Sequence, residues 1–311
     1  MINCTDFSFP SSDGATSLHG CAWFDSDSAP RAVLQIAHGV SEHISRYDHF
    51  ARFLVRHGFA VVGHDHLGHG DSLPEGGTPI YFADEDGWKR AVDDVALLQS
   101  RIRREAPDLP LFLLGHSMGS FLARTFLIRY PRRVRGAVIM GTGWQSGFTI
   151  RGGLMVASAA ALKGGKRRTS NLITNLAFGG YNKAFSPNRT AFDWLSADSE
   201  NVDRYIADPQ CGQDATIGLF EDMLGGIRFN QQPANLRRMD PDTPVLFISG
   251  EQDPVGAMGK GVLRSRDAFR KAGVKDIKCI LYPGLRHEIL NEQLQQSQVY
   301  ADLLDWLISH L

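Results

Sequence analysis

The chain has 311 residues, of which 43% are hydrophobic, and its 33 lysines and arginines nearly balance its 34 aspartates and glutamates. This hydrophobic fraction excludes a disordered chain, and the length suits one large domain or one domain with an insertion. The formal net charge of −1 provides no overall attraction to nucleic acid or to an anionic membrane.

The cysteines and the first residues bear on the cellular environment. The four cysteines are scattered and include no Cys-x-x-Cys pair, which disfavours a zinc site or a disulfide framework. The N-terminal segment lacks the positive charge and apolar run of a secretory signal, so we expect a cytoplasmic protein. The most apolar helical stretch, residues 154–162, is far shorter than the roughly 20 residues that span a bilayer. Peripheral contact with lipid stays open as an alternative.

Short apolar runs alternate with amphipathic helical patterns along most of the chain, which is typical of a mostly parallel sheet covered by helices. Strands are expected at residues 32–37, 59–63, 111–114, 136–140, 244–249 and 278–282. Helices are expected at residues 46–57, 88–105, 117–130 and about 291–311. The alternation stops between about residues 141 and 233 and resumes at the strand beginning at Pro244. We therefore expect residues 142–233 to form a helical cap inserted into a core made of residues 1–141 and 234–311.

The strongest local signal is the segment Gly-His-Ser-Met-Gly at residues 115–119. It follows a predicted strand and precedes a predicted helix, which is the context of the G-x-S-x-G nucleophile elbow. Glycines suit this turn because a Cβ atom at either position would clash with its close-packed surroundings. The pattern predicts that Ser117 is a nucleophile held at the carboxyl end of the sheet. The alternative is a buried serine that caps the helix.

A serine hydroxyl needs a base, and the base needs a group that orients it. In this architecture the acid and the histidine follow the serine in the chain. Asp253 lies on the loop after the strand at 244–249, with Glu251 as its competitor nearer the strand end. His287 lies on the loop after the last strand, so we predict that it is the general base and that Asp253 holds its tautomer.

The tetrahedral intermediate of acyl transfer needs preorganised hydrogen-bond donors for its oxyanion. One should be the backbone N–H of Met118, the residue after the nucleophile. The other should come from the loop after the strand at 32–37, where the N–H of Val40 is the natural donor. We interpret His38 as a residue that shapes this loop and not as a proton carrier.

Three blocks of sequence then resemble the monoacylglycerol lipase and lysophospholipase branch of the α/β-hydrolases. They lie at residues 38–47, 63–72 and 115–119, and the family writes them roughly as HGxxEHxxRY, DHxGHGxS and GHSMGG. The chain departs at Ser120, where the family usually has glycine. The resemblance implies the α/β-hydrolase fold, with a helical cap inserted after the sixth strand. It is weak in the cap, where the substrate is selected.

The resemblance also implies residue roles. Ser117, Asp253 and His287 would be the catalytic triad, with Val40 and Met118 as the oxyanion hole. Four further motif residues would support the site without reacting: Glu42, His43, Asp65 and His69. No cofactor or metal is implied. The group His64, Asp65, His66 and His69 could bind a metal by composition, but the glycines between them suit a tight turn better.

The leading hypothesis is a serine hydrolase that cleaves esters of monoacyl lipids through an acyl-enzyme, with peripheral lipid contact through the cap as an option. A first alternative is an aminopeptidase, which would need an acidic cluster in the cap to hold a substrate ammonium. The cap's acidic residues are Asp193, Asp198, Glu200, Asp203, Asp208 and Asp214. Residues 199–206 are expected to form a helix with Val202, Tyr205 and Ile206 inward, which assigns these charges to the solvated face. A second alternative is a non-catalytic receptor that uses the same pocket.

Overall fold

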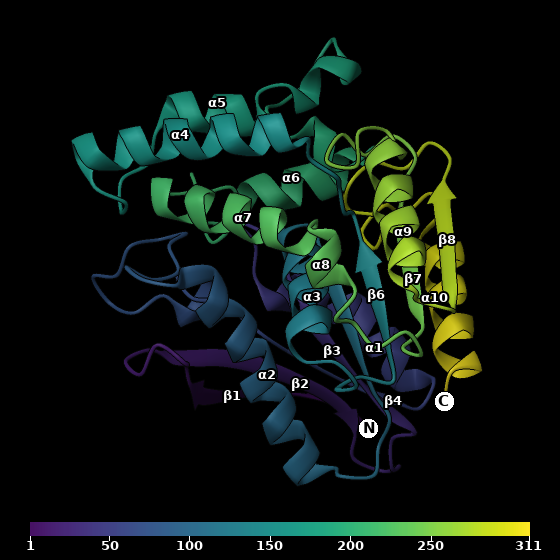
Figure 1. Ribbon diagram of the computed structural model, residues 1–311. Coiled ribbons are helices and arrows are strands. Elements are labelled where there is room, and N and C mark those ends of the chain that lie inside the picture. Colours follow the sequence, from purple (N-terminus) through teal and green to yellow (C-terminus); the bar gives the residue numbers. More distant parts are fainter.

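The computed structural model describes residues 1–311 and contains one open sheet of eight strands with helices on both faces (Figure 1). The strands are β1 (Ile2–Pro10), β2 (Ser17–Asp25), β3 (Ala32–Ala37), β4 (Phe59–His64), β5 (Leu111–His116), β6 (Gly136–Met140), β7 (Val245–Gly250) and β8 (Ile277–Tyr282). Their order across the sheet is β1-β2-β4-β3-β5-β6-β7-β8. All neighbours from β4 to β8 are parallel, whereas β1 and β2 form an antiparallel hairpin that pairs with β4. The predicted α/β fold class is confirmed.

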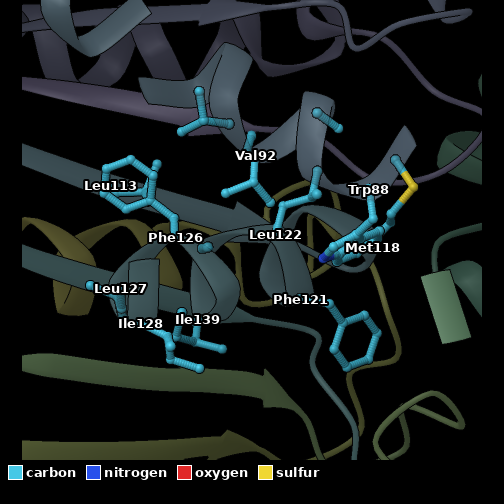
Figure 2. Close-up of a cluster of buried hydrophobic side chains, with 14 of the residues drawn as sticks. Trp88, Val92, Leu113, Met118, Phe121, Leu122, Phe126, Leu127, Ile128 and Ile139 are labelled. Carbon is cyan, nitrogen blue, oxygen red and sulfur yellow. The ribbon is translucent and has the colours of Figure 1, made fainter. Parts of the chain in front are cut away.

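The strand side chains alternate between two hydrophobic cores because successive residues of a strand point to opposite faces. In β5, Leu113 packs with α2 (Gly87–Glu105), α3 (Met118–Arg129) and α9 (Lys260–Ala272). Its neighbour Leu114 packs on the other face, with α1 (Asp48–Arg56) and α10 (Gln296–Ser309). Figure 2 shows the first core, where side chains of α3 such as Phe121, Leu122 and Phe126 lie beside Trp88 and Val92 of α2.

The expected strands and helices of the core occur in the structure, with four differences. The hairpin of β1 and β2 was not predicted: β1 lies at the sheet edge with most of its residues exposed, and the apolar run of β2 is limited to residues 21–24. The charged helix α9 was also not predicted. The expected helix at 46–57 is divided into a 3₁₀ turn, Ile44–Tyr47, followed by α1, and the last helix begins at Gln296 instead of about residue 291.

Between β6 and β7 the chain forms α4 (Gly147–Gly164), α5 (Asn171–Phe178), α6 (Ser199–Ala207), α7 (Ile217–Asn230) and α8 (Pro233–Leu236). Helices α4, α5, α6 and α7 lie above the carboxyl ends of the strands, and α4 and α5 form the outermost layer (Figure 1). In α6, Val202 and Tyr205 are buried as expected, but Ile206 is 47% exposed, so its predicted inward orientation is wrong. None of the helices combines the length and hydropathy that crossing a membrane requires.

The two ends of this helical segment are joined to each other. The backbone N–H of Gln145 donates to the side-chain oxygen of Gln231 (2.9 Å), and the amide of Gln231 donates back to the carbonyl of Gln145 (2.8 Å). Beneath them the fully buried Arg124 of α3 donates to the carbonyl of Gly143 (2.9 Å). Burial lowers the pKa of Arg124 to about 9. Because both ends are fastened at one place, we propose that residues 142–233 are a cap unit on a core of residues 1–141 and 234–311.

Candidate active site

Ser117 occupies a strained turn between β5 and α3. Its backbone has φ 53° and ψ −119°, a region that residues with a Cβ rarely adopt. The turn is possible because its flanking glycines touch backbone: a Cβ on Gly115 would lie 2.2 Å from the carbonyl oxygen of Gly119, and one on Gly119 would lie 2.0 Å from that of Ala37. The N–H of Ser117 donates to the carbonyl of Met140 in β6 (3.0 Å). The side chain of Ser117 is thereby presented at the carboxyl end of the sheet, beside a cavity.

The structure brings His287 and Asp253 together from two loops. Nδ1 of His287 lies 2.9 Å from a carboxylate oxygen of Asp253, and both side chains are buried. The same oxygen accepts a hydrogen bond from Ser249 (3.1 Å), and the other accepts one from the N–H of Val255 (2.8 Å). The carboxylate is therefore fixed, and it holds the proton of His287 on Nδ1 and leaves Nε2 for a reacting group.

Ser117 and His287 line the same cavity, but the hydroxyl of Ser117 makes no hydrogen bond within the protein. Such contacts are often long before substrate binds and shorten in the reacting complex. Glu251 is exposed and forms no hydrogen bond with His287. Of the two carboxylates considered from sequence, only Asp253 contacts the histidine.

The loop after β3 lies directly against Ser117. A Cβ on Gly39 would lie 3.1 Å from the Cβ of Ser117. The N–H of Gly39 is occupied by a side-chain oxygen of Glu42 (2.5 Å). The N–H groups of Val40 and Met118 have no hydrogen-bond partner in the protein. Two unpaired donors next to a serine at the end of a strand suit the binding of a developing oxyanion.

A buried network supports this loop from below. Glu42 accepts hydrogen bonds from Tyr47 (3.0 Å) and Arg46 (2.9 Å), and Arg46 also forms a two-pronged ion pair with Glu288 (2.6 and 2.7 Å). Burial by itself would raise the pKa of Glu42, but the hydrogen bond from His116 and the charges of His116 and Arg46 outweigh it and hold the pKa well below its usual value. Glu42 is thus a charged residue that positions the loop.

His116, the residue before the serine, joins this network to the histidine loop. Its Nδ1 lies 3.0 Å from Glu42, its Nε2 lies 3.3 Å from the carbonyl of His287, and its ring packs 4.7 Å from the ring of His287. Desolvation would lower its pKa, but the contact with Glu42 raises it overall. The sequence predicted Glu42 as a supporting residue. It placed Arg46, Tyr47 and His116 within motifs without assigning them a role, and it did not indicate Glu288. Arg46 and Glu288 are 242 positions apart, so no local pattern could pair them.

The other predicted supporting residues shape neighbouring loops. His43 pairs with Asp208 of the cap (2.8 Å), and Asp65 accepts hydrogen bonds from His19 (2.9 Å) and the N–H of Ile44 (2.7 Å). His38 donates through Nδ1 to the carbonyl of Gly39 (2.7 Å), which is the loop-shaping role expected for it. The supporting residues therefore hold backbone in place around the site.

Four histidines form a buried cluster beneath the loop after β3: His38, His64, His66 and His69. Three of them have one ring nitrogen facing a backbone carbonyl, and neither nitrogen of His64 has a partner. The ligand atoms of His64, Asp65, His66 and His69 do not converge as a metal site requires. Burial lowers the pKa of every histidine in the cluster, to about 3 for His64 and His69. The cluster is therefore neutral at pH 7.

We expect His64→Leu to reduce the loss of stability in acid. His64 binds its proton near pH 6.5 when unfolded but only near pH 3 when folded, so its contribution is complete above pH 6.5 and is lost as the pH falls toward 3. At pH 5 it lies 1.5 pH units below the unfolded value, which corresponds to about 2 kcal/mol. Urea unfolding at pH 7 and pH 5 should therefore show that His64→Leu loses about 2 kcal/mol less than wild type. The exposed His57→Leu is the matched control and should lose as much as wild type. Equal losses for all three proteins would contradict the prediction.

A cavity of about 290 Å³ lies between the sheet and the helical segment above it. Its floor includes Val40, Ser117 and His287, and its walls include residues of the helical segment. These wall residues are Thr174, Asn175, Phe178, Gly179, Ala191, Phe192, Trp194, Leu195, Tyr205, Gly212, Gln213, Asp214 and Ala215. The cavity thus combines apolar and aromatic surface with the reactive side chains at one end.

The acidic residues of the cap do not gather in the cavity. Only Asp214 lines it. Asp193 accepts hydrogen bonds from the backbone N–H groups of Arg189 and Thr190. Asp203 pairs with Arg189 (2.7 Å), and Asp208 pairs with His43. The two buried glutamates that reach the cavity wall, Glu42 and Glu288, are both paired with Arg46. Of the three carboxylates that line the cavity, only Asp214 has no arginine partner.

Residues 28–294 match the protein family described as serine aminopeptidase, S33. A monoacylglycerol lipase from Mycolicibacterium smegmatis is 30% identical over 92% of this chain and 91% of its own length, and human monoglyceride lipase is 26% identical over 92% and 86%. A thermostable carboxyl esterase from Bacillus coagulans superposes with a TM-score of 0.91 at 25% identity, covering 99% of both chains. A soluble variant of monoglyceride lipase from Saccharomyces cerevisiae shares the fold, with a TM-score of 0.76 at 16% identity over 98% of this chain and 94% of the lipase.

Proposed function

The chain belongs to the serine aminopeptidase S33 family and is a carboxylic ester hydrolase, and on this premise we propose that it cleaves monoacyl lipid esters through Ser117, His287 and Asp253. The proposed substrates are monoacylglycerols and lysophospholipid-type esters. The observation that carries the proposal is that Ser117 and the His287–Asp253 pair open onto one cavity with apolar walls. A hydrolysis panel of p-nitrophenyl esters, monoacylglycerols, lysophospholipids and aminoacyl anilides tests it.

The proposed reaction proceeds in two halves through an acyl-enzyme. Oγ of Ser117 attacks the ester carbonyl while Nε2 of His287 takes the hydroxyl proton, and Asp253 stabilises the imidazolium that forms. The N–H groups of Val40 and Met118 donate to the oxyanion of the tetrahedral intermediate. His287 returns its proton to the leaving alcohol, and the ester bond breaks. Water, deprotonated by the same histidine, then attacks the acyl-enzyme. The bond to Oγ of Ser117 breaks, His287 returns the proton to Oγ, and the fatty acid is released.

The side chains that line the cavity identify which cap residues would contact the acyl chain. The composition of the cap by itself predicts an acyl wall drawn from its large apolar side chains, namely Trp144, Phe148, Leu154, Met155, Val156, Leu162, Leu172, Ile173, Leu176, Phe178, Phe185, Trp194, Ile217, Leu219 and Phe220. Among these only Phe178 and Trp194 line the cavity. Met155 is 73% exposed on the outer side of α4, and Ile217, Leu219 and Phe220 are buried in the core. We therefore assign the acyl wall to Phe178 and Trp194, whose rings lie nearly parallel, 6.5 Å apart.

We expect kcat/KM to rise with acyl length from acetyl to medium-chain p-nitrophenyl esters. Each buried CH₂ contributes about 0.8 kcal/mol, so each methylene that contacts the apolar cavity wall should raise kcat/KM by up to about fourfold. Phe178→Ala should flatten this rise, because it removes part of the apolar cavity wall. It should leave acetate hydrolysis within about twofold of wild type, because it removes no reacting group. Met155→Ala, on the neighbouring helix but exposed, is the matched control and should keep the wild-type profile. A profile that is flat or falling in wild type would leave only a short-chain esterase.

We further propose that the outer layer of the cap contacts lipid aggregates peripherally. Large apolar side chains are exposed along α4 and α5, namely Phe148, Met155, Leu162, Leu172 and Leu176. Exposed apolar groups gathered in this way favour an apolar partner surface. The same two helices form the outermost layer over the sheet (Figure 1), so a lipid surface touching them would lie on the cavity side of the molecule.

Two alternatives are separated by the same panel. An aminopeptidase would need a free carboxylate for the substrate ammonium, and the cavity offers only the exposed Asp214 at its wall. Turnover of aminoacyl anilides above that of esters would favour it. A non-catalytic receptor would bind ligands without turnover and would leave Ser117 unlabelled by a fluorophosphonate.

A further inference from the structure

The backbone partner of the proposed general base belongs to the cap. His287 lies on the loop between β8 and α10, and its N–H donates to the carbonyl of Leu195 (3.0 Å). The N–H of Glu288 donates to the same carbonyl (2.8 Å). Leu195 is the last residue of a 3₁₀ turn, Asp193–Leu195, inside the cap. The orientation of the histidine thus depends on a segment about 90 residues away in sequence.

Two side chains of the histidine loop fasten that cap segment on either side of this contact. Nη1 of Arg286 donates to the carbonyls of Asp193 (2.5 Å) and Ser196 (3.1 Å). The carboxylate of Glu292 accepts from the N–H of Ala197 (2.8 Å) with one oxygen and from the N–H of Arg286 (2.7 Å) with the other. Glu292 is 1% exposed, so its two hydrogen bonds are shielded from competing water.

The fastened segment also carries a side chain against the histidine. The ring of Trp194 lies 5.2 Å from the ring of His287 and forms part of the cavity wall. The guanidinium of Arg286 in turn lies 3.9 Å from the ring of Phe185, another cap residue. In contrast, α4 buries only Ile150 and Ala157, and α5 buries only Ile173. The cap therefore joins the histidine loop through hydrogen bonds at residues 193–197, whereas α4 and α5 contribute few buried side chains.

We infer that Arg286 and Glu292 are positioning residues, which fasten cap residues 193–197 to the histidine loop and thereby set the orientation of His287 toward Ser117. This inference rests on the proposed function. An imidazole displaced by about 1 Å from its reacting geometry costs on the order of 10²-fold in rate. Neither Arg286 nor Glu292 lines the cavity, so their contacts with the cap should affect the chemical step and not substrate binding.

The test compares Arg286→Met, Arg286→Lys and Glu292→Gln with wild type. Methionine keeps the apolar stem but no donor, lysine keeps the charge and a donor, and glutamine keeps only one accepting oxygen. Arg189→Met is the matched control, because Arg189 donates to the carbonyl of Ser199 (3.2 Å) and pairs with Asp203 inside the cap without reaching the histidine loop. Steady-state kinetics on acetyl and octanoyl p-nitrophenyl esters are normalised to active sites titrated with excess fluorophosphonate, and melting temperatures are measured in parallel.

We expect kcat per active site to fall about 10- to 100-fold in Arg286→Met and Glu292→Gln, equally for both esters, with KM within about twofold. Arg286→Lys should lie between Arg286→Met and wild type, and Arg189→Met should match wild type. Unchanged kcat per active site, even with a lowered melting temperature, would overturn the inference, as would a change confined to KM for the octanoyl ester. If Arg286→Met fails to fold, the lysine and glutamine variants decide. Failure of the proposed function would be distinguishable, since wild type itself would then either not titrate at Ser117 or turn over aminoacyl anilides better than esters.

Discussion

Replacing Ser117 with alanine is expected to reduce kcat about 10⁶-fold while the protein remains folded. The serine at φ 53° contributes its hydroxyl to no hydrogen bond within the protein, so alanine, which also carries a Cβ, should accept the same backbone without loss of packing. Hydrolysis of p-nitrophenyl butyrate and the melting temperature should be measured together. The melting temperature should stay within a few degrees of wild type.

Ser120→Ala is the matched control for this change. Ser120 lies one turn into the same helix, is fully buried and donates to the carbonyl of Ser117 (2.6 Å), yet it does not face the cavity. It should retain activity within about tenfold. Substantial hydrolysis by folded Ser117→Ala would show that the nucleophile is a different residue.

Asp253→Asn should lower kcat about 10⁴-fold with little change in fold. The asparagine amide can face Nδ1 of His287 with its NH₂ group, and an NH₂ facing Nδ1 stabilises the tautomer with its proton on Nε2. That tautomer cannot accept the proton of Ser117. The effect depends on the 2.9 Å contact between Nδ1 of His287 and the Asp253 carboxylate.

Glu251→Gln separates this explanation from a general effect of removing a carboxylate from the loop. Glu251 is two residues from Asp253, but it is exposed and makes no contact with His287, so its activity should be that of wild type. The reverse result, a severe defect in Glu251→Gln and a mild one in Asp253→Asn, would assign the acid to Glu251.

Both substitutions concern residues that were identified from local sequence patterns, and the reason is geometric. A nucleophile elbow needs a strand, two glycines and a helix within a dozen residues, so its signal is contained in one segment. The order of serine, acid and histidine then limits the partners to the loops after β7 and β8. The N-terminal hairpin could not be predicted from a local pattern, because an edge strand such as β1 exposes most of its side chains and carries no apolar run.

The cap residues that line the cavity, in contrast, were not identified from local sequence patterns. Its position between two strands could be predicted from the interruption of the alternating pattern, but the side chains that line the cavity could not. Met155 and Phe178 are both apolar residues on cap helices, yet one faces solvent and the other faces the cavity. Which face of a helix points inward over an irregular cavity depends on how α4 and α5 lie on α7 and the loops beneath.

The sequence by itself determined the parallel α/β core, the strained turn at Ser117 and the loops that carry Asp253 and His287, because each strand, turn and loop is encoded within a short segment. Only the tertiary structure decided the pairing of Asp253 over Glu251, the Arg46 network under the loop after β3, and the contact of His287 with Leu195. Apart from the pair of Glu42 and Arg46, which are four positions apart, these contacts join residues tens to hundreds of positions apart, and a single sequence carries no periodicity or spacing that links such residues. They arise when buried charges must find partners, which folding settles in three dimensions.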